Sequence, residues 1–111
     1  MHVRIARFEG IDPQQIGQRL EDIRASVELV RSGGTPEGIP EESSRVLRED
    51  VTRVMTVVDR SGGVAIDLVF AESEEAIGRV HEALDRMSPP EGAGRRASWE
   101  ICEVAFDEAM R

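Results

Sequence analysis

The feature that most constrains the fold of this chain is the stretch from Val51 to Ala71, which reads as two strands joined by a tight turn. Both runs are rich in Val, Ile, Thr and Phe, residue types that favour extended backbone. Between them, residues 59–63 read Asp-Arg-Ser-Gly-Gly and supply the residue types that a short chain reversal needs. The stretch therefore predicts a β-hairpin, and the other elements have to pack around it.

Two amphipathic helices are expected, one before and one after the hairpin in the sequence. The first follows Asp12 and Pro13, a capping residue and a favourable first helical residue, and its apolar positions recur every three or four residues to about Ser32. The second begins after Ser73 and is expected to stop at residues 88–90, Ser-Pro-Pro. Between the first helix and the hairpin, residues 33–44 predict a long loop, and residues 41–48 are compatible with a short helical turn.

Two further strands complete the pattern, at residues 2–9 and 97–106. The order is then strand, helix, strand, strand, helix, strand, which predicts a ferredoxin-like α+β fold. In that βαββαβ fold, four strands form one antiparallel sheet and both helices cover the same face. Because 111 residues suffice for one core of this size, residues 1–111 are expected to form a single domain.

The third predicted strand, residues 64–71, is apolar on both faces except for Asp67. We expect the larger residues, at even positions from 64 to 70, to face the helices, and the residues at odd positions from 65 to 71 to lie on the opposite face. That second face is too apolar to remain in water, and a sheet of this kind is commonly buried against a second copy of itself. The sequence therefore predicts a homodimer in which the two sheets form an α/β barrel.

Composition disfavours several classes of partner. Asp and Glu total 22 against 14 Lys plus Arg, so the formal charge is -8, which disfavours nucleic acid and anionic membrane surfaces. No apolar run approaches the roughly 20 residues of a membrane-spanning helix, and no signal peptide is expected at the N-terminus. The one cysteine, Cys102, excludes an internal disulfide. Together these features point to a cytoplasmic protein.

Several short motifs resemble a known group of proteins. They are Val58-Asp59-Arg60, Gly62-Gly63, the apolar alternation to Phe70, Glu72-Ser73-Glu74-Glu75-Ala76-Ile77, and Glu100 with Glu103-Val104. This pattern resembles the small dimeric α/β barrel proteins related to the antibiotic-biosynthesis monooxygenases. The resemblance implies two sheets closed into one barrel per dimer and, in members that act on ligands, a small cavity between each sheet and its helices. Members include cofactor-free oxygenases of polycyclic quinone-like substrates, haem-degrading enzymes and many proteins without known activity.

The chain departs from the haem-degrading members of that family. Those members use a histidine on the second helix, which would be His81 here, an asparagine in the first strand and a tryptophan that ends the third. This chain has Arg4 and Arg7 but no amide in the first strand, and Phe70-Ala71 ends the third. We therefore expect no tight haem binding and no other cofactor. Metal sites are not expected either, because two histidines and one cysteine far apart in sequence fit no zinc spacing.

Four residues are candidates for a ligand site: Thr56, Asp67, His81 and Trp99. If Asp59 pairs with Val64 across the turn, Thr56 falls opposite Asp67, on the sheet face turned away from the helices. Asp67 then either accepts hydrogen bonds from Thr56 or from an arginine of the partner chain, or points to water at the barrel rim. A purely structural role stays open for His81, as a hydrogen-bonded residue at the edge of the helix stripe, and for Trp99, in the core or dimer interface.

Two classes of function remain open at this point. The first is a site within each subunit, lined by the four candidate residues, that binds a small apolar or aromatic molecule or oxidises it without a cofactor. The second is a non-enzymatic dimerisation or accessory module without a ligand site. A cavity between sheet and helices favours the first, and a filled interior favours the second. The sequence does not decide whether the protein is an enzyme.

Overall fold

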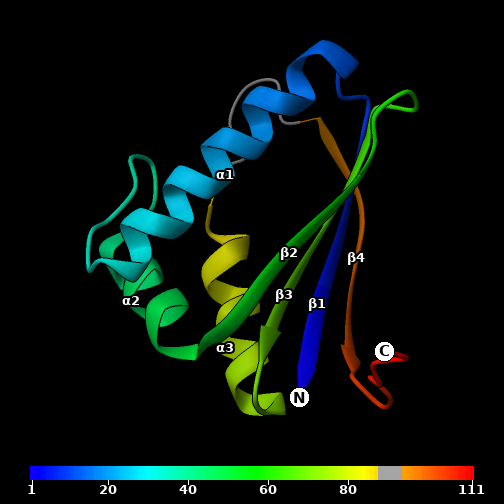
Figure 1. Cartoon of the computed structure of the whole chain (residues 1–111). Helices are drawn as coiled ribbons and strands as arrows, with labels where there is room; N and C mark the ends of the chain where they lie inside the picture. Colours follow the sequence, from blue (N-terminus) through cyan, green and yellow to red (C-terminus); the bar gives the residue numbers. More distant parts are fainter. Residues whose placement is uncertain (88–93) are drawn as a thin grey trace.

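The computed structural model describes residues 1–87 and 94–111. In chain order the elements are β1 (His2–Glu9), η1 (Pro13–Gln15), α1 (Ile16–Arg31), α2 (Glu41–Asp50), β2 (Val51–Asp59), β3 (Val64–Ala71), α3 (Glu74–Asp85) and β4 (Arg95–Glu103). The strands form one antiparallel sheet in the order β2-β3-β1-β4, with the helices on one side of it (Figure 1). This is the ferredoxin-like arrangement predicted from the element order, with α2 as an addition.

The hairpin that joins β2 and β3 has the predicted register, with Asp59 opposite Val64. Within the turn, the Asp59 carboxylate accepts hydrogen bonds from the Gly62 N–H at 3.1 Å and the Ser61 hydroxyl at 3.2 Å. Gly63 has a φ of +67°, and a side chain there would collide with the backbone carbonyl of Ile11. The turn therefore fixes the register through its own side chains and through a glycine that no other residue replaces without strain.

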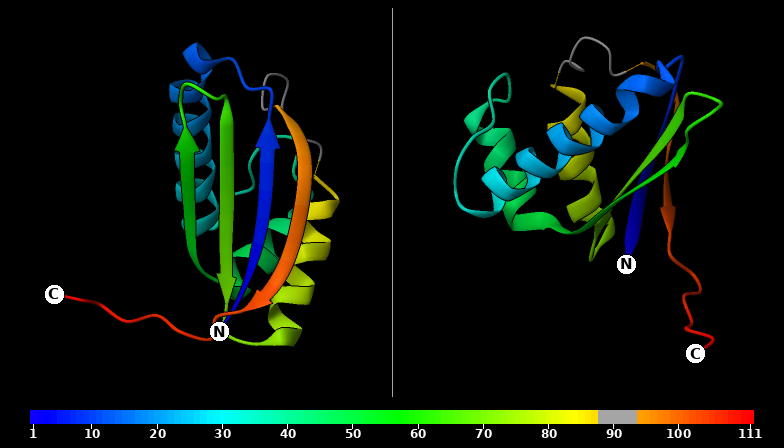
Figure 2. Two further views of the ribbon diagram at one scale, coloured as in Figure 1. Left: turned by 90° about the vertical axis from the view of Figure 1, so that its right-hand side faces the viewer. Right: turned by 45° about the horizontal axis from the view of Figure 1, so that its top comes forward.

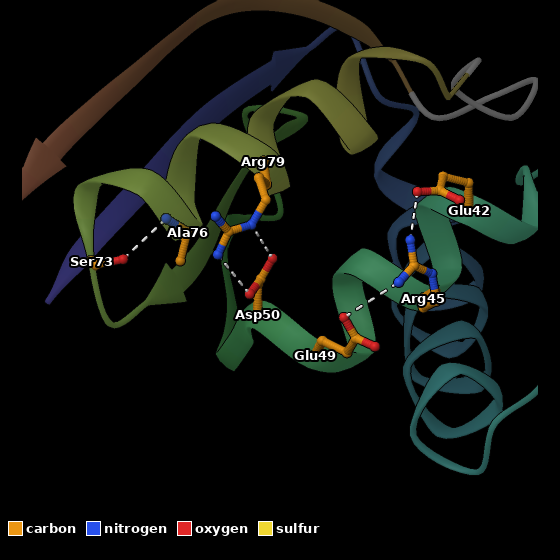
Figure 3. Close-up of polar contacts among 7 residues, drawn as sticks. All are labelled: Glu42, Arg45, Glu49, Asp50, Ser73, Ala76 and Arg79. Atoms are coloured by element: carbon orange, nitrogen blue, oxygen red, sulfur yellow. Dashed lines mark hydrogen bonds and ion pairs between the residues drawn. The ribbon is translucent and has the colours of Figure 1, made fainter.

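The predicted helix starts are present, with one difference in geometry. The Ala76 N–H donates to the Ser73 hydroxyl at 3.1 Å, which caps α3 as expected (Figure 3). Asp12 also caps, accepting from the Gln14 N–H at 3.0 Å, but the first turn is the 3₁₀ segment η1 and α1 begins only at Ile16. β4 runs from 95 to 103 instead of 97 to 106, and the predicted helix stop at 88–90 lies outside the described residues.

Two apolar clusters fill the space between the sheet and the helices. One joins Val69 and Ala71 of β3 to three residues of α3, namely Ala76, Ile77 and Val80. The other joins Ala65 of β3 to Ile11 and Ile16 at the start of α1. The residues that β3 contributes are small, so the helices lie close to the sheet backbone.

The predicted sidedness of β3 is wrong. Its odd positions from 65 to 71 face the helices, and its larger residues at 64, 66, 68 and 70 lie on the other face. Because both faces of the strand are apolar, the alternation alone does not select one. Ala65 and Ala71, both fully buried, allow close approach of the helices, whereas longer side chains at those positions would hold the helices away.

The segment predicted as a long loop with a short helical turn contains a ten-residue helix, α2, which packs beside α3. Its buried Ser44 hydroxyl donates to the Gly34 carbonyl at 2.8 Å. At its other end, Asp50 accepts two hydrogen bonds from the Arg79 guanidinium of α3, at 2.9 and 3.2 Å (Figure 3). Residues 41–44 of the predicted loop thus belong to a helix that also includes the expected helical turn at 41–48 and is tied to α3 by a bidentate ion pair.

The Asp50–Arg79 pair makes stability depend on pH. The hydrogen bond from Arg79 lowers the pKa of the Asp50 carboxyl below its ordinary value of 3.8, outweighing burial, which raises it. A lowered folded-state pKa means that the stabilisation is fully present above the unfolded-state pKa and is lost as pH falls through the folded-state pKa. We therefore expect Asp50→Asn to reduce stability at pH 7 and to make its further loss below about pH 4 shallower than in the wild type.

Urea denaturation at pH 7 and pH 3 measures this effect. Glu49→Gln is the matched control, because it removes a carboxylate from the same helix. The side chain of Glu49 is 59% exposed, whereas that of Asp50 is 16% exposed. A wild type and an Asp50→Asn variant that lose the same stability between the two pH values would contradict the expectation.

Candidate functional site

The four candidate residues all lie on the helix-facing side of the sheet. Thr56 pairs with Asp67, Asp67 with Ala6, and Ala6 with Trp99, so three of the four lie in one row across all four strands. His81 comes from α3, which packs over this face. The expected pairing of Thr56 with Asp67 is present, but the expected face is wrong, for the reason given for β3. Contacts divide the four residues into two separate groups.

The first group is centred on the Asp67 carboxylate, which accepts three hydrogen bonds. Two come from the Arg19 guanidinium of α1, at 3.3 and 3.0 Å, and one from the Thr56 hydroxyl at 3.0 Å. The Arg19 side chain is 9% exposed and that of Asp67 is 22% exposed. The guanidinium also lies 4.9 Å from the centre of the Phe8 ring. The threonine donor matches the prediction, whereas the arginine comes from the same chain and not from a partner.

This arrangement limits what Asp67 does chemically. A carboxylate that already accepts three hydrogen bonds, two of them from a cation, is a poor proton acceptor for a substrate. The pair instead connects α1 to β3, with Thr56 of β2 as a third member. Asp67, Thr56 and Arg19 therefore form an internal ion-pair network that holds α1 on the sheet.

The second group links a buried cation to an exposed aromatic ring. Arg4 of β1 is only 5% exposed, and its Nε–H donates to His81 Nδ1 at 3.1 Å. The His81 ring in turn lies 4.3 Å from the Trp99 ring, between centroids, at an interplanar angle of 34°. Trp99 is 44% exposed. Because Nδ1 accepts a hydrogen bond, the imidazole proton is on Nε2.

Sequence reasoning did not identify Arg4 as a site residue. Burial lowers the pKa of its guanidinium and the neighbouring Arg96 lowers it further, whereas Asp85 and Asp67 act in the opposite direction. The signal in the sequence was an arginine within the apolar first strand, between Val3 and Ile5. Since both of those residues lie on the other face of β1, the arginine shares its face with Ala6 and points to the helices.

Neither of two hollows on the described surface is lined by any of the four candidate residues. One, of about 210 Å³, lies on the open face of the sheet around Arg7, Val57 and Ile66. The other, of about 200 Å³, lies between α2 and α3 around Ser43, Arg79 and Arg86. The candidate residues therefore line neither hollow.

Within residues 1–87 and 94–111, no three His, Cys, Asp or Glu side chains gather where they would hold one metal ion. In the same part of the chain, no helix combines the length and the apolar character needed to cross a membrane.

No protein-family model matches the chain, and no curated protein sequence matches it. Solved structures similar to it include SCO4226 from Streptomyces coelicolor A3(2), with 18% identity, a TM-score of 0.46 and coverage of 97% of this chain and 100% of that one. Another is Rv0793 from Mycobacterium tuberculosis, with 13% identity, a TM-score of 0.46 and coverage of 97% of each chain. At this level, neither likeness supports a conclusion about function, and the fold assignment rests on the strand order and register of the chain itself.

Proposed function

We propose that the protein binds a small aromatic molecule beside α3, where Arg4, His81 and Trp99 meet. The observation that supports this most directly is the continuous contact from a buried arginine, through an imidazole, to a tryptophan ring that is 44% exposed. Small-molecule sites typically combine an aromatic surface with a few placed polar groups. Trp99 offers the surface, and the Arg4–His81 pair offers hydrogen-bond donors next to it.

The contacts favour binding over cofactor-free oxygenation. Oxygenation of a phenolic substrate without a cofactor needs a base that takes its proton. Asp67 is occupied by three donors, and the free nitrogen of His81, Nε2, carries a proton in the tautomer that Arg4 selects. The arrangement therefore supports a binding protein more directly than an oxygenase.

Two observations favour the second candidate function, a dimerisation module without a ligand site. None of the four candidate residues lines either hollow. Thr56 and Asp67, two of the four candidate residues, are fully satisfied by contacts within the chain. In that case His81 and Trp99 also serve packing alone, and the protein acts only through its assembly.

Both functions include a homodimer, which we propose to form through the open face of the sheet. The left view of Figure 2 shows this face turned to the viewer, with the helices behind it and no described element in front. It carries a set of apolar residues from three strands: Ile5, Met55, Val57, Ile66, Leu68 and Phe70. An apolar surface of this extent favours association with a second copy of the same sheet.

Val57→Lys is expected to shift the proposed dimer to monomer, because it places a charge in the apolar face. Val54→Lys is the matched control, since Val54 lies on the same strand but points to the opposite side of the sheet, and the two valines are 46% and 38% exposed in the single subunit. Sedimentation velocity at micromolar concentration distinguishes the two masses. A wild type that sediments as a monomer, or equal effects of both variants, would contradict this interface.

Titration calorimetry with 2-naphthol tests the ligand site. Saturable binding is expected, and Trp99→Leu should weaken it because the ring loses its packing surface. Phe106→Leu is the control, since Phe106 is an aromatic residue on the C-terminal tail and 84% exposed. Native mass spectrometry of the freshly purified protein reports any retained ligand. An absence of saturable binding for 2-naphthol and also for 2-naphthoate, with no retained ligand, would favour the dimerisation module.

A further inference from the structure

The most buried arginine described donates its hydrogen bond to a neutral group. Arg4, 5% exposed, donates to the His81 imidazole, and no carboxylate lies within salt-bridge distance of it among residues 1–87 and 94–111. Arg19, the other arginine with a nearly buried side chain, has a bidentate carboxylate partner. Even the exposed Arg45 and Arg79 are paired with carboxylates. The usual rule that a buried charge is paired with an opposite charge thus does not hold for Arg4 among the described residues.

The carboxylates near Arg4 act on it from a distance and are paired with other residues. Asp85 is near enough to act on the Arg4 guanidinium, but its carboxylate is engaged by Arg96 at 3.3 Å. Asp67 is engaged by Arg19 and Thr56. Burial is the largest influence on the pKa of Arg4 and lowers it. A buried cation without a carboxylate in direct contact is costly for the fold, so an anion that reaches Arg4 would bind with a favourable electrostatic contribution.

We propose that Arg4 anchors the carboxylate of a small aromatic acid whose ring packs against Trp99. This inference rests on the proposed binding function and specifies its ligand class. The Nε–H of Arg4 is used by His81, which leaves the terminal Nη1 and Nη2 groups without hydrogen bonds to described residues. Those two nitrogens form the edge of the guanidinium that matches the two oxygens of a carboxylate.

His81 is a positioning residue in this arrangement. Its Nδ1 holds the guanidinium by the Nε–H, and its ring lies against Trp99, so the cation and the aromatic surface are linked by one side chain. A ligand that spans them needs a carboxylate and a planar ring. A phosphate dianion fits less well, because Arg4 offers a single guanidinium edge and the chain carries a formal charge of -8.

Titration calorimetry at pH 7 with three probes of one shape tests the ligand class: 2-naphthoate, 2-naphthol and 2-naphthylmethylammonium. We expect 2-naphthoate to bind about tenfold or more tightly than 2-naphthol, and the cation to bind least, because a charge-assisted bidentate hydrogen bond contributes on that scale. Arg4→Gln should remove the advantage of 2-naphthoate and leave 2-naphthol binding nearly unchanged. Arg7→Gln is the control, since it removes the same charge from the same strand on the opposite face of the sheet.

Several results would overturn the inference. Equal affinities of the wild type for 2-naphthoate and 2-naphthol would overturn the inference but not the proposed binding function. An unchanged 2-naphthoate affinity in Arg4→Gln does so as well. If Arg4→Gln does not fold, Arg4→Lys replaces it, because it keeps the charge but loses the planar guanidinium. Arg4→Lys is expected to bind 2-naphthoate with reduced affinity. Wild-type affinity in this variant would also overturn the inference. Failure of all three probes removes the proposed function together with the inference.

One further variant tests for a partner from the chain itself. Glu91 lies outside the described residues. Glu91→Gln is expected to leave stability and 2-naphthoate affinity near those of the wild type. A loss of stability as large as that in Arg4→Gln would assign the carboxylate partner of Arg4 to Glu91 and overturn the inference.

Discussion

Asp67→Ala is expected to lower the free energy of unfolding by about 3 kcal/mol, because it leaves the Arg19 guanidinium nearly buried without its carboxylate. The value lies at the lower end of the range for buried pairs, since the Asp67 side chain retains 22% exposure. The Thr56 hydroxyl loses its acceptor in the same variant. Urea denaturation at pH 7 measures the change.

Asp22→Ala is the matched control for this prediction. Asp22 lies on the exposed side of α1 and accepts a single hydrogen bond, from Gln18. A double-mutant cycle of Asp67→Ala with Arg19→Met separates the interaction energy of the Asp67–Arg19 ion pair from the loss of packing. A coupling energy of about 1 to 3 kcal/mol is expected. Additive single effects, or a loss in Asp67→Ala no larger than in Asp22→Ala, would show that the network does not hold α1 on the sheet.

Ile77→Ala is expected to cost roughly 2 to 5 kcal/mol, because the side chain is 1% exposed and the variant leaves a cavity between α3 and β3. The neighbouring Val69 and Val80 are in the same cluster and cannot move far without losing their own contacts. The cost in stability is therefore not reduced much by relaxation.

Denaturant unfolding of Leu29→Ala provides the comparison for Ile77→Ala. Leu29 lies on α1 and is 42% exposed, so the same kind of truncation there should cost much less. Leu20, half-buried beside the second cluster, should give an intermediate loss. Equal losses at Leu29 and Ile77 would contradict the position of the core described for α3.

The parts of the fold that could be predicted from sequence are those that local chemistry determines. The turn at Asp59 to Gly63 has the residues that its geometry needs, so both the hairpin and its register followed. From that register came the pairing of Thr56 with Asp67, which is a contact of the candidate site. Ser73, a capping residue, likewise predicted the start of α3 correctly.

The sidedness of the sheet could not be predicted, because it depends on contacts between distant segments. β3 is apolar on both faces, and its larger residues looked like the core. The decisive factor was the small size of Ala65 and Ala71, which lets helices from elsewhere in the chain approach the strand. A period-two pattern carries no information about that approach.

The same limit applies to the polar contacts of the candidate site. Arg19 and Asp67 are 48 positions apart, and Arg4 and His81 are 77 positions apart. Asp67 and Arg4 each stand out as a charged residue among apolar strand residues, but neither indicates which distant residue is its partner. Only the packing of α1 and α3 on the sheet brings the partners within hydrogen-bond distance, so the Arg4–His81 contact had no sequence signal of its own.

The central position of β1 has a consequence for the order of folding. β1 lies between β3 and β4, pairing His2 with Ala71 on one side and with Glu103 on the other. Both partners are far along the chain, so during synthesis the first strand emerges long before either neighbour exists, and closing those long loops is slow. The hairpin of β2 and β3 needs only its own turn and forms early. The apolar residues Val3 and Ile5 of β1 therefore remain without a partner strand in the nascent chain until the hairpin provides an edge, which leaves this segment open to aggregation during synthesis.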